Sequence, residues 1–147
     1  MELVWQQARA ATFVAVSGSV PPGVAPQQYV ELIRGLPLDA FVCIDTSGPT
    51  LAAALDLPLD LLKINMHELS AALGQPITTP DQARAAAVAV LQRGPQRVVV
   101  TLGAQGAVAV DAHGARRART PPVEPIRTSL TPCDRYQGGL ILRSCSV

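Results

Sequence analysis

Four short apolar segments, each followed or preceded by a stretch with helical spacing, constrain the fold of this chain more than any other feature. The segments are Thr12–Val16, Ala40–Ile44, Leu61–Ile64 and Val98–Thr101. They are apolar throughout instead of alternating with polar residues, which is typical of strands buried on both faces. The alternation of such strands with helices predicts an α/β fold, a doubly wound, mostly parallel sheet with helices on both faces, and therefore three layers.

Glycine or proline delimits the helices that separate these strands. Thr79 is expected to cap a helix whose first residue is Pro80, and Gly94 with Pro95 follows the end of that helix. The predicted helices are Glu2–Ala10, Pro26–Gly35, Thr50–Leu57, Met66–Leu73 and Pro80–Gln92.

The pattern changes after the fourth strand. Val98–Val100 and Ala107–Val110 are separated by a short break that contains glycine, so the two segments are expected to be neighbouring strands. The turn, strands and helix predicted after them are Asp111–Gly114, Ala115–Thr120, Val123–Ile126 and Asp134–Leu142.

Composition limits both the core and the partners of the chain. Hydrophobic residues make up 48% of the 147 residues and aromatic residues only 3%, so Ala, Val and Leu must form the core. This length favours a single domain spanning residues 1–147. The net charge of +1 indicates no nucleic-acid-binding face, and we interpret the cluster Arg116, Arg117 and Arg119 as a solvated edge.

The cysteines and histidines do not form a metal-binding pattern. Cys43, Cys133 and Cys145 are odd in number and widely spaced, and His67 and His113 are too far apart in the sequence to suggest a zinc site. No apolar run reaches the roughly 18 residues of a membrane span, and the first residues lack the pattern of a signal peptide. We therefore expect a soluble cytoplasmic protein that binds neither membranes nor nucleic acid.

Polar clusters follow three of the predicted strands, at Asp45–Gly48, Lys63–Glu68 and Thr101–Gly106. Open α/β sheets bind ligands at the carboxyl ends of their strands, where these clusters meet. Lys63 can neutralise phosphate charge, and Glu68 can hold magnesium directly or through water. Such an edge suits a nucleotide that carries a metal ion.

Each of these residues also has a purely structural interpretation. Asn65 and Glu68 can be the cap and the acidic first turn of a helix, and Lys63 can be an exposed lysine at a strand end. Thr101 can offer its hydroxyl to a phosphate, and glycines at 103 and 106 allow close approach of a ligand. The same glycines are also common in ordinary turns.

Taken in order, four motifs resemble those of the ribokinase-like phosphofructokinase B family of carbohydrate kinases. The closest resemblance is to the branch of 1-phosphofructokinase and tagatose-6-phosphate kinase, and it covers about Glu2 to Leu142. The motifs are Ser17-Gly18-Ser19-Val20-Pro21-Pro22-Gly23, Asp45-Thr46-Ser47-Gly48, Lys63-x-Asn65-x-x-Glu68 and Thr101-Leu102-Gly103-Ala104-Gln105-Gly106.

The resemblance implies an ATP-dependent kinase that phosphorylates a small sugar phosphate with the help of Mg²⁺. It implies that Lys63 contacts nucleotide phosphate, that Asn65 organises phosphate, and that Glu68 binds the metal. Asp134 takes the place of the catalytic base. The resemblance also places Thr101, Leu102, Gly103, Ala104, Gln105 and Gly106 around the nucleotide and Ser17, Gly18 and Ser19 beside the substrate.

The chain departs from the family just before Asp134, where Thr131-Pro132-Cys133 replaces Gly-Ala-Gly. Pro132 has no N–H to donate, and Thr131 and Cys133 carry Cβ atoms that disfavour the backbone conformations open to glycine. Nothing matches the family's amino-terminal half or its last segment, so the fold is expected to be incomplete at both ends.

Three hypotheses follow: a phosphosugar kinase, an inactive nucleotide-binding remnant, and an unrelated doubly wound binding protein. The incomplete sheet also predicts self-association, because an uncovered edge would be exposed. Neither the sugar nor the oligomeric state follows from the sequence.

Overall fold

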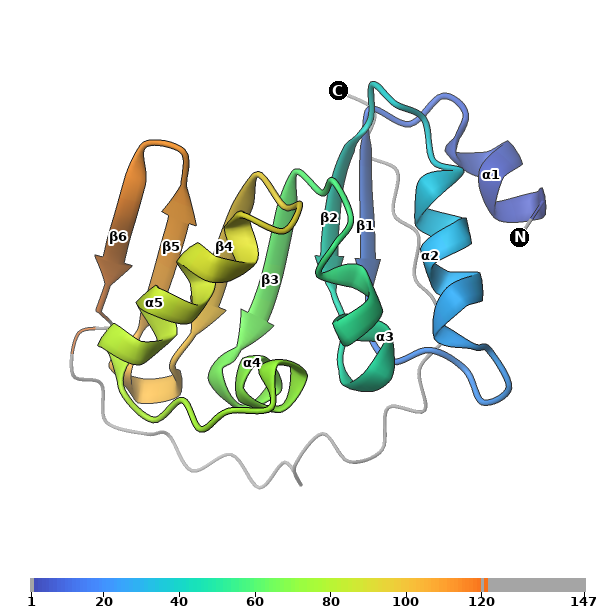
Figure 1. Cartoon of the computed structure of the whole chain (residues 1–147). Helices are drawn as coiled ribbons and strands as arrows, with labels where there is room; N and C mark the ends of the chain where they lie inside the picture. The colour runs from blue at the N-terminus through green and yellow to red at the C-terminus, as the bar shows by residue number, and fades with distance from the viewer. Residues whose placement is uncertain (1, 120, 122–147) are drawn as a thin grey trace.

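The structure is a computed structural model, and it describes residues 2–119 and 121. Its centre is a six-stranded sheet in which the strands lie side by side in chain order (Figure 1). The first four strands are parallel, and the last two run antiparallel to their neighbours. The strands are β1 (Phe13–Ser17), β2 (Phe41–Asp45), β3 (Leu61–Asn65), β4 (Arg97–Thr101), β5 (Ala107–Asp111) and β6 (Gly114–Ala118).

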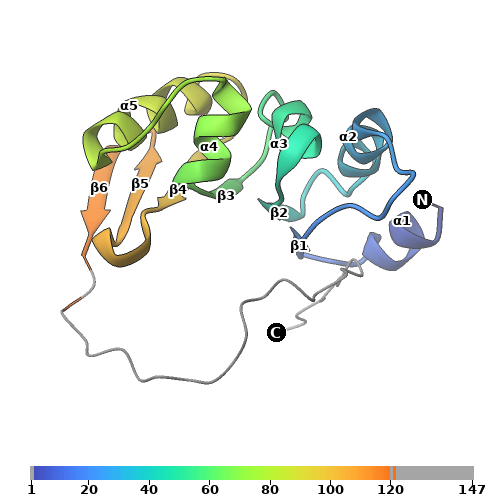
Figure 2. The ribbon, with the colours of Figure 1, turned by 90° about the horizontal axis from the view of Figure 1, so that it is seen from below.

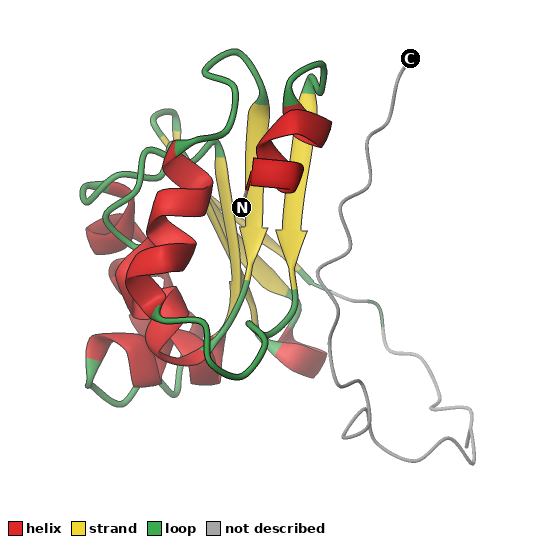
Figure 3. Cartoon of the chain, turned by 90° about the vertical axis from the view of Figure 1, so that its right-hand side faces the viewer, coloured by secondary structure: helices red, strands yellow, loops and turns green. Residues whose placement is uncertain are grey.

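Helices cover one face of this sheet. The described α-helices are α1 (Glu2–Ala8), α2 (Pro26–Arg34), α3 (Gly48–Ala54), α4 (Met66–Leu73) and α5 (Pro80–Leu91). Helices α2 to α5 all lie on the same side of the strands, as Figures 2 and 3 show from two directions.

The single covered face follows from the strand order. Connections between parallel strands are almost always right-handed, so strands added in one direction place every connecting helix on the same side. The predicted α/β fold with a mostly parallel sheet is confirmed. The described residues show two layers of the expected three, because no helix among them covers the second face. Helix α1 packs beside α2, where Trp5 Nε1 donates a hydrogen bond to the Leu32 carbonyl at 3.0 Å.

The core lies between the sheet and the helices. Alternate residues of the strands face the helices and are almost completely buried, whereas the residues between them are only half-buried or exposed. As predicted, the buried residues of the strands are aliphatic, and they come from every strand except β6, which is exposed along its whole length. They are Val14, Val16, Val42, Ile44, Leu62, Ile64, Val98, Val100, Val108 and Val110.

The other face of the sheet carries an aromatic cluster at the amino ends of the first strands. The rings of Phe13 and Phe41 are stacked with their centroids 5.2 Å apart, and the guanidinium of Arg97 lies 5.8 Å from the centre of the Phe41 ring.

The predicted elements agree with the structure to within a few residues. Helix α4 spans the predicted Met66–Leu73, whereas α3 begins at Gly48 and ends at Ala54 instead of spanning Thr50–Leu57. The difference arises because Pro49 lies in the first turn of α3, a position that tolerates proline, and not in the turn before the helix. The predicted strand Val123–Ile126 and helix Asp134–Leu142 lie outside the described residues. No helix in the described part of the chain is long and apolar enough to span a membrane.

Candidate active site

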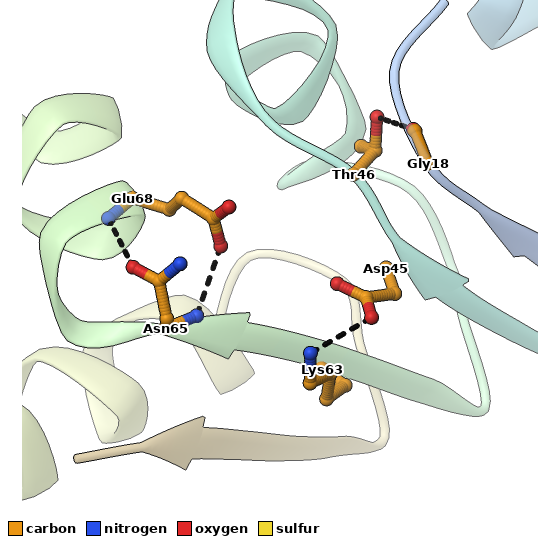
Figure 4. Close-up of polar contacts among 6 residues, drawn as sticks. All are labelled: Gly18, Asp45, Thr46, Lys63, Asn65 and Glu68. Atoms are coloured by element: carbon orange, nitrogen blue, oxygen red, sulfur yellow. Dashed lines mark hydrogen bonds and ion pairs between the residues drawn. The ribbon is translucent and has the colours of Figure 1, made fainter. Parts of the chain in front are cut away.

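The carboxyl ends of the four parallel strands meet at one edge of the sheet, the lower edge in Figure 1. The register pairs Ser17 with Asp45 across β1 and β2, and Asn65 with Thr101 across β3 and β4. The polar clusters expected at the strand ends are therefore brought together, as Figure 4 shows for the residues of β2, β3 and α4.

Asn65 and Glu68 form a reciprocal cap at the start of α4. The Glu68 backbone N–H donates to Asn65 Oδ1 at 2.8 Å, and the Asn65 backbone N–H donates to Glu68 Oε2 at 3.0 Å (Figure 4). This arrangement satisfies two N–H groups that a helix start otherwise leaves without partners. The structural interpretation of this pair is therefore observed, and any ligand role of Asn65 and Glu68 must be compatible with the cap.

Lys63 forms an ion pair with Asp45. This pairing was not predicted from the sequence. Lys63 Nζ lies 2.8 Å from Asp45 Oδ2, and the two side chains retain 41% and 34% exposure (Figure 4). Both residues lie on the face of the sheet that no described helix covers. The pairing follows from the strand register, in which Cys43 lies beside Leu61 and Ile44 beside Leu62. The signal in the sequence was an acidic residue and a basic residue at the ends of consecutive parallel strands.

Cys43 is half-buried next to this ion pair. Burial raises the pKa of its thiol, the Asp45 carboxylate raises it further, and Lys63 opposes the rise. A thiol with a raised pKa is protonated at neutral pH and is a poor nucleophile. Cysteine-based catalysis is therefore not supported at this edge.

The glycine-containing loop after β4 is a closed turn. Residues Gly103–Gln105 form a single 3₁₀ turn, the Leu102 N–H donates to the Gly106 carbonyl at 2.8 Å, and the Gly106 N–H donates to the Gly103 carbonyl at 3.1 Å. Gly106 has a φ of +92°, and a Cβ at this position would collide with the carbonyl of Ala118. The structural interpretation of these glycines is thus observed, and the loop still lies beside Asn65 through the Asn65–Thr101 pairing.

The loop between β1 and α2 is attached to the end of β2. The Gly18 N–H donates to the Asp45 carbonyl at 2.9 Å, and Thr46 Oγ1 donates to the Gly18 carbonyl at 3.0 Å (Figure 4). Ser17 and Ser19 on either side of Gly18 are exposed. A cavity of about 220 Å³ lies against this loop and is lined by Gly18, Ser19, Val20, Pro21, Val24, Gln28, Tyr29, Leu32 and Val4.

The described residues can accommodate a magnesium ion only with help from a ligand. They contain no group of three or more histidine, cysteine, aspartate or glutamate side chains placed to hold a metal. Mg²⁺ usually keeps several waters and takes one or two carboxylates together with substrate phosphates. One oxygen of Glu68 belongs to the cap, and the other makes no hydrogen bond to the described residues. The donor set therefore fits Mg²⁺ that arrives with a nucleotide.

Asp134, the predicted base, and Thr131-Pro132-Cys133 before it lie outside the described residues.

A family model described as pfkB family carbohydrate kinase matches residues 1–129. The chain belongs to this family. This result excludes the hypothesis of an unrelated doubly wound binding protein. The resemblance inferred from the four motifs is thereby confirmed at the level of the family.

Two curated relatives show the kind of pfkB protein to which this chain is similar. It is 40% identical over 114 residues to ATP-dependent 6-phosphofructokinase isozyme 2 of Escherichia coli, and the match covers 76% of this chain and 37% of that protein. It is 38% identical over 138 residues to 1-phosphofructokinase of Rhodobacter capsulatus, and the match covers 91% of this chain and 42% of that protein. The chain thus spans about two-fifths of the length of these relatives.

Solved structures agree with the fold. Phosphofructokinase-2 from Escherichia coli in complex with fructose-6-phosphate matches 84% of this chain and 42% of its own, with a TM-score of 0.75 and 36% identity. A ribokinase from Arabidopsis thaliana complexed with ribose and ATP matches 85% of this chain and 40% of its own, with a TM-score of 0.65 and 19% identity, which supports the ribokinase-like fold alone.

Proposed function

We propose that this pfkB chain takes part in the transfer of the γ-phosphate of ATP to a hydroxyl group of a sugar phosphate. Its substrate is expected to be of the 1-phosphofructokinase or tagatose-6-phosphate kinase type. The observation that carries the proposal is the meeting of Lys63, the Asn65–Glu68 cap and the Thr101–Gly106 loop at one edge of the sheet, in a chain of this family. The names of the relatives support phosphofructokinase-like chemistry.

Lys63 is proposed to neutralise phosphate charge on the nucleotide. An ammonium group has three N–H donors, and the ion pair with Asp45 engages Nζ from one direction only. A phosphate oxygen can therefore bind Nζ while the ion pair is kept. The exposure of both side chains leaves Nζ accessible to a ligand.

Glu68 would hold Mg²⁺ through the carboxylate oxygen that is not used in the cap. When bound, the metal ion neutralises charge on the nucleotide phosphates. Asn65 keeps Glu68 in position through the cap, and the Thr101–Gly106 loop is proposed to contact the nucleotide beside it.

Asp134 is proposed to act as the general base. Its carboxylate accepts the proton of the sugar hydroxyl while the hydroxyl oxygen bonds to the γ-phosphorus. At the same time the bond from the γ-phosphorus to the bridging oxygen breaks, and ADP leaves. The Asp134→Asn variant keeps the shape of the side chain but cannot accept this proton.

A thermal melt of the purified chain with and without Mg-ATP tests the nucleotide part of the proposal. A ligand that binds only the folded state raises stability by about 2.7 kcal/mol at a hundredfold excess over its Kd. We expect the melt to move upward with Mg-ATP and the Lys63→Met variant to lose most of this shift. A cooperative melt that does not respond to Mg-ATP would contradict nucleotide binding.

A phosphorylation assay with fructose 1-phosphate and tagatose 6-phosphate tests the catalytic part. The expected result is slow turnover that Asp134→Asn abolishes. Equal turnover by the parent chain and by Asp134→Asn would remove the proposed role of Asp134.

The alternative is a nucleotide-binding remnant without catalytic activity, and the sequence Thr131-Pro132-Cys133 favours it. Loss of one preorganised N–H donor to a developing anion costs roughly 10²–10³ in rate, and Pro132 has no N–H. A triple variant with Gly-Ala-Gly at positions 131–133 separates the two candidates. If the fold retains the rest of the site, this variant gains at least about a hundredfold in turnover.

We also propose that the chain self-associates, because the described sheet has one face that no described helix covers. One relative, phosphofructokinase-2 of Escherichia coli, has been solved in a tetrameric inhibited form. Light scattering over a range of concentrations measures the mass directly. A monomer at the highest concentration would contradict self-association.

A further inference from the structure

Two hydrogen bonds hold the peptide groups on both sides of Gly18. The Gly18 N–H donates to the Asp45 carbonyl at 2.9 Å, and the Gly18 carbonyl accepts from Thr46 Oγ1 at 3.0 Å (Figure 4). The first bond continues the pairing of β1 with β2, whereas the second comes from a side chain in the loop after β2. Thr46 therefore determines the orientation of the Gly18–Ser19 peptide group, which the sheet alone leaves undetermined.

Burial makes the Thr46 hydroxyl specific for this bond. Thr46 is only 3% exposed. A buried hydroxyl without a partner is costly, so the Thr46 hydroxyl is strongly favoured to remain bonded to the Gly18 carbonyl.

The orientation of this peptide group decides where the Ser19 N–H points. In a trans peptide group the carbonyl and the following N–H point in opposite directions. Because the Gly18 carbonyl faces the buried Thr46, the Ser19 N–H faces away from it. Ser19 is exposed, and its N–H makes no hydrogen bond to any residue that the structure describes. Gly18 has a φ of +102° and would tolerate other peptide orientations if Thr46 did not hold it.

Tyr29 adds a second buried hydroxyl close to Thr46. Tyr29 is 3% exposed, and its hydroxyl has no hydrogen-bond partner among the described residues. Burial raises the pKa of Tyr29 above its ordinary range, with the nearby Thr46 hydroxyl opposing the rise and the Asp45 carboxylate adding to it. The phenol is therefore neutral. Tyr29 lines the same cavity as Gly18 and Ser19.

We infer that Thr46 is a positioning residue for the sugar phosphate: its hydroxyl holds the Gly18–Ser19 peptide so that the Ser19 N–H is presented to an anionic oxygen of the phosphoryl acceptor. This inference rests on the proposed function for the identity of the ligand. It predicts that loss of the hydroxyl weakens binding of the sugar phosphate and leaves binding of the nucleotide unchanged, because Lys63 and Glu68 belong to other strands and helices.

Three variants test the inference. Thr46→Val replaces the hydroxyl with a methyl group of similar size, and Thr46→Ser keeps the hydroxyl. Thr78→Val removes a hydroxyl that donates to Gln82 Oε1 at the start of α5, away from the loop, and is the matched control. The first measurement is amide hydrogen exchange at Gly18 and Ser19 by NMR, without ligand. Thr46→Val loses the hydrogen bond to the Gly18 carbonyl, so local opening of the loop should cost less free energy and the Gly18 N–H should exchange about tenfold faster. In Thr46→Ser and Thr78→Val the Gly18 N–H should exchange at the parent rate.

The second measurement is the Kd for fructose 1-phosphate, for fructose 6-phosphate and for Mg-ATP, each determined by calorimetry on the same variants. The expected result is a rise of about tenfold in the Kd for the sugar phosphate in Thr46→Val, with the Kd for Mg-ATP unchanged. Thr46→Ser should restore the parent value.

The outcomes separate the inference from the proposed function. Parent-like hydrogen exchange in Thr46→Val overturns the positioning role, whatever the ligand. An equal loss of affinity for both ligands indicates a general structural defect and also overturns it. If the parent chain binds neither sugar phosphate, the proposed acceptor is wrong and the ligand part of the inference fails with it, while hydrogen exchange still decides whether Thr46 holds the loop.

Discussion

The two faces of the sheet differ in what they contribute to this molecule. On the face covered by α2 to α5, alternate strand residues such as Ile44, Leu62 and Ile64 are completely buried. On the opposite face, the residues between them include Asp45, Lys63 and the stacked rings of Phe13 and Phe41, and these are half-buried or exposed. The same strands therefore supply the hydrophobic core on one side and accessible polar chemistry on the other.

The largest expected effect tests this contrast within β3. Ile64→Ala removes a fully buried side chain and should lower the free energy of unfolding by about 2–5 kcal/mol. Leu61→Ala, on the opposite face of the same strand, should cost clearly less because Leu61 is only half-buried. Urea denaturation measures both values. An equal cost would mean that the second face is also packed, by something other than the described residues.

The next effect concerns the carboxyl edge, where the two faces meet. Asn65→Ala removes the side chain that accepts from the Glu68 N–H and should destabilise the chain by about 1 kcal/mol. Ser47→Ala is the matched control, since Ser47 precedes α3 without a capping hydrogen bond from its side chain. Chemical denaturation of both variants gives the comparison. Equal losses would show that the cap seen at α4 makes no specific contribution.

A smaller effect on stability, with a large effect on ligand binding, is expected for the uncovered face. Lys63→Met should change the free energy of unfolding by at most about 1 kcal/mol, because exposed ion pairs contribute little. The same variant should lose the stabilisation by Mg-ATP. Melts with and without the nucleotide measure both quantities. A strongly destabilised variant would show that the Lys63–Asp45 pair is mainly structural.

The smallest effect is expected for an ion pair remote from the strand ends. Arg93 binds Asp56 through two hydrogen bonds of 2.7 and 3.0 Å, which lower the pKa of Asp56. A carboxyl group with a lowered pKa in the folded state adds stability above its unfolded pKa of about 3.9, and this contribution is lost as the pH falls through the folded pKa. The difference in the free energy of unfolding between neutral pH and pH 3 should therefore be smaller in Arg93→Gln than in the parent chain. Because Asp56 is 64% exposed, the change should be small, and a parent-like pH profile would show that it is negligible.

Local signals in the sequence predicted most of the fold. Asn65 caps the start of α4, Gly74 caps its end, and α5 begins at Thr79 and Pro80. These signals are visible in the sequence because caps and proline act within one turn of the chain. The covered and uncovered faces could not be distinguished in this way. They depend on the order of the strands in the sheet, which an apolar segment such as Leu61–Ile64 does not reveal.

The candidate site was predicted less completely, for a related reason. The residues at the strand ends were identified, and the capping alternative for Asn65 is what the structure shows. The ion pair of Lys63 with Asp45 joins residues 18 positions apart in the chain. The hydrogen bond from Thr46 to Gly18 joins residues 28 positions apart. Such contacts depend on strand register, which sequence periodicity does not determine. The roles of Lys63, Glu68 and Asp134 toward ligands stay predictions.

The order of the strands has a consequence for how the chain is made. Each strand lies beside the one synthesised just before it, so the sheet can grow at a single edge as the polypeptide leaves the ribosome. None of the described strands has to insert between two that are already paired, and none of the connections between them has to pass beneath another. The described sheet therefore has a first edge, β1, and a last edge, β6, and the direction from one to the other is the direction of translation.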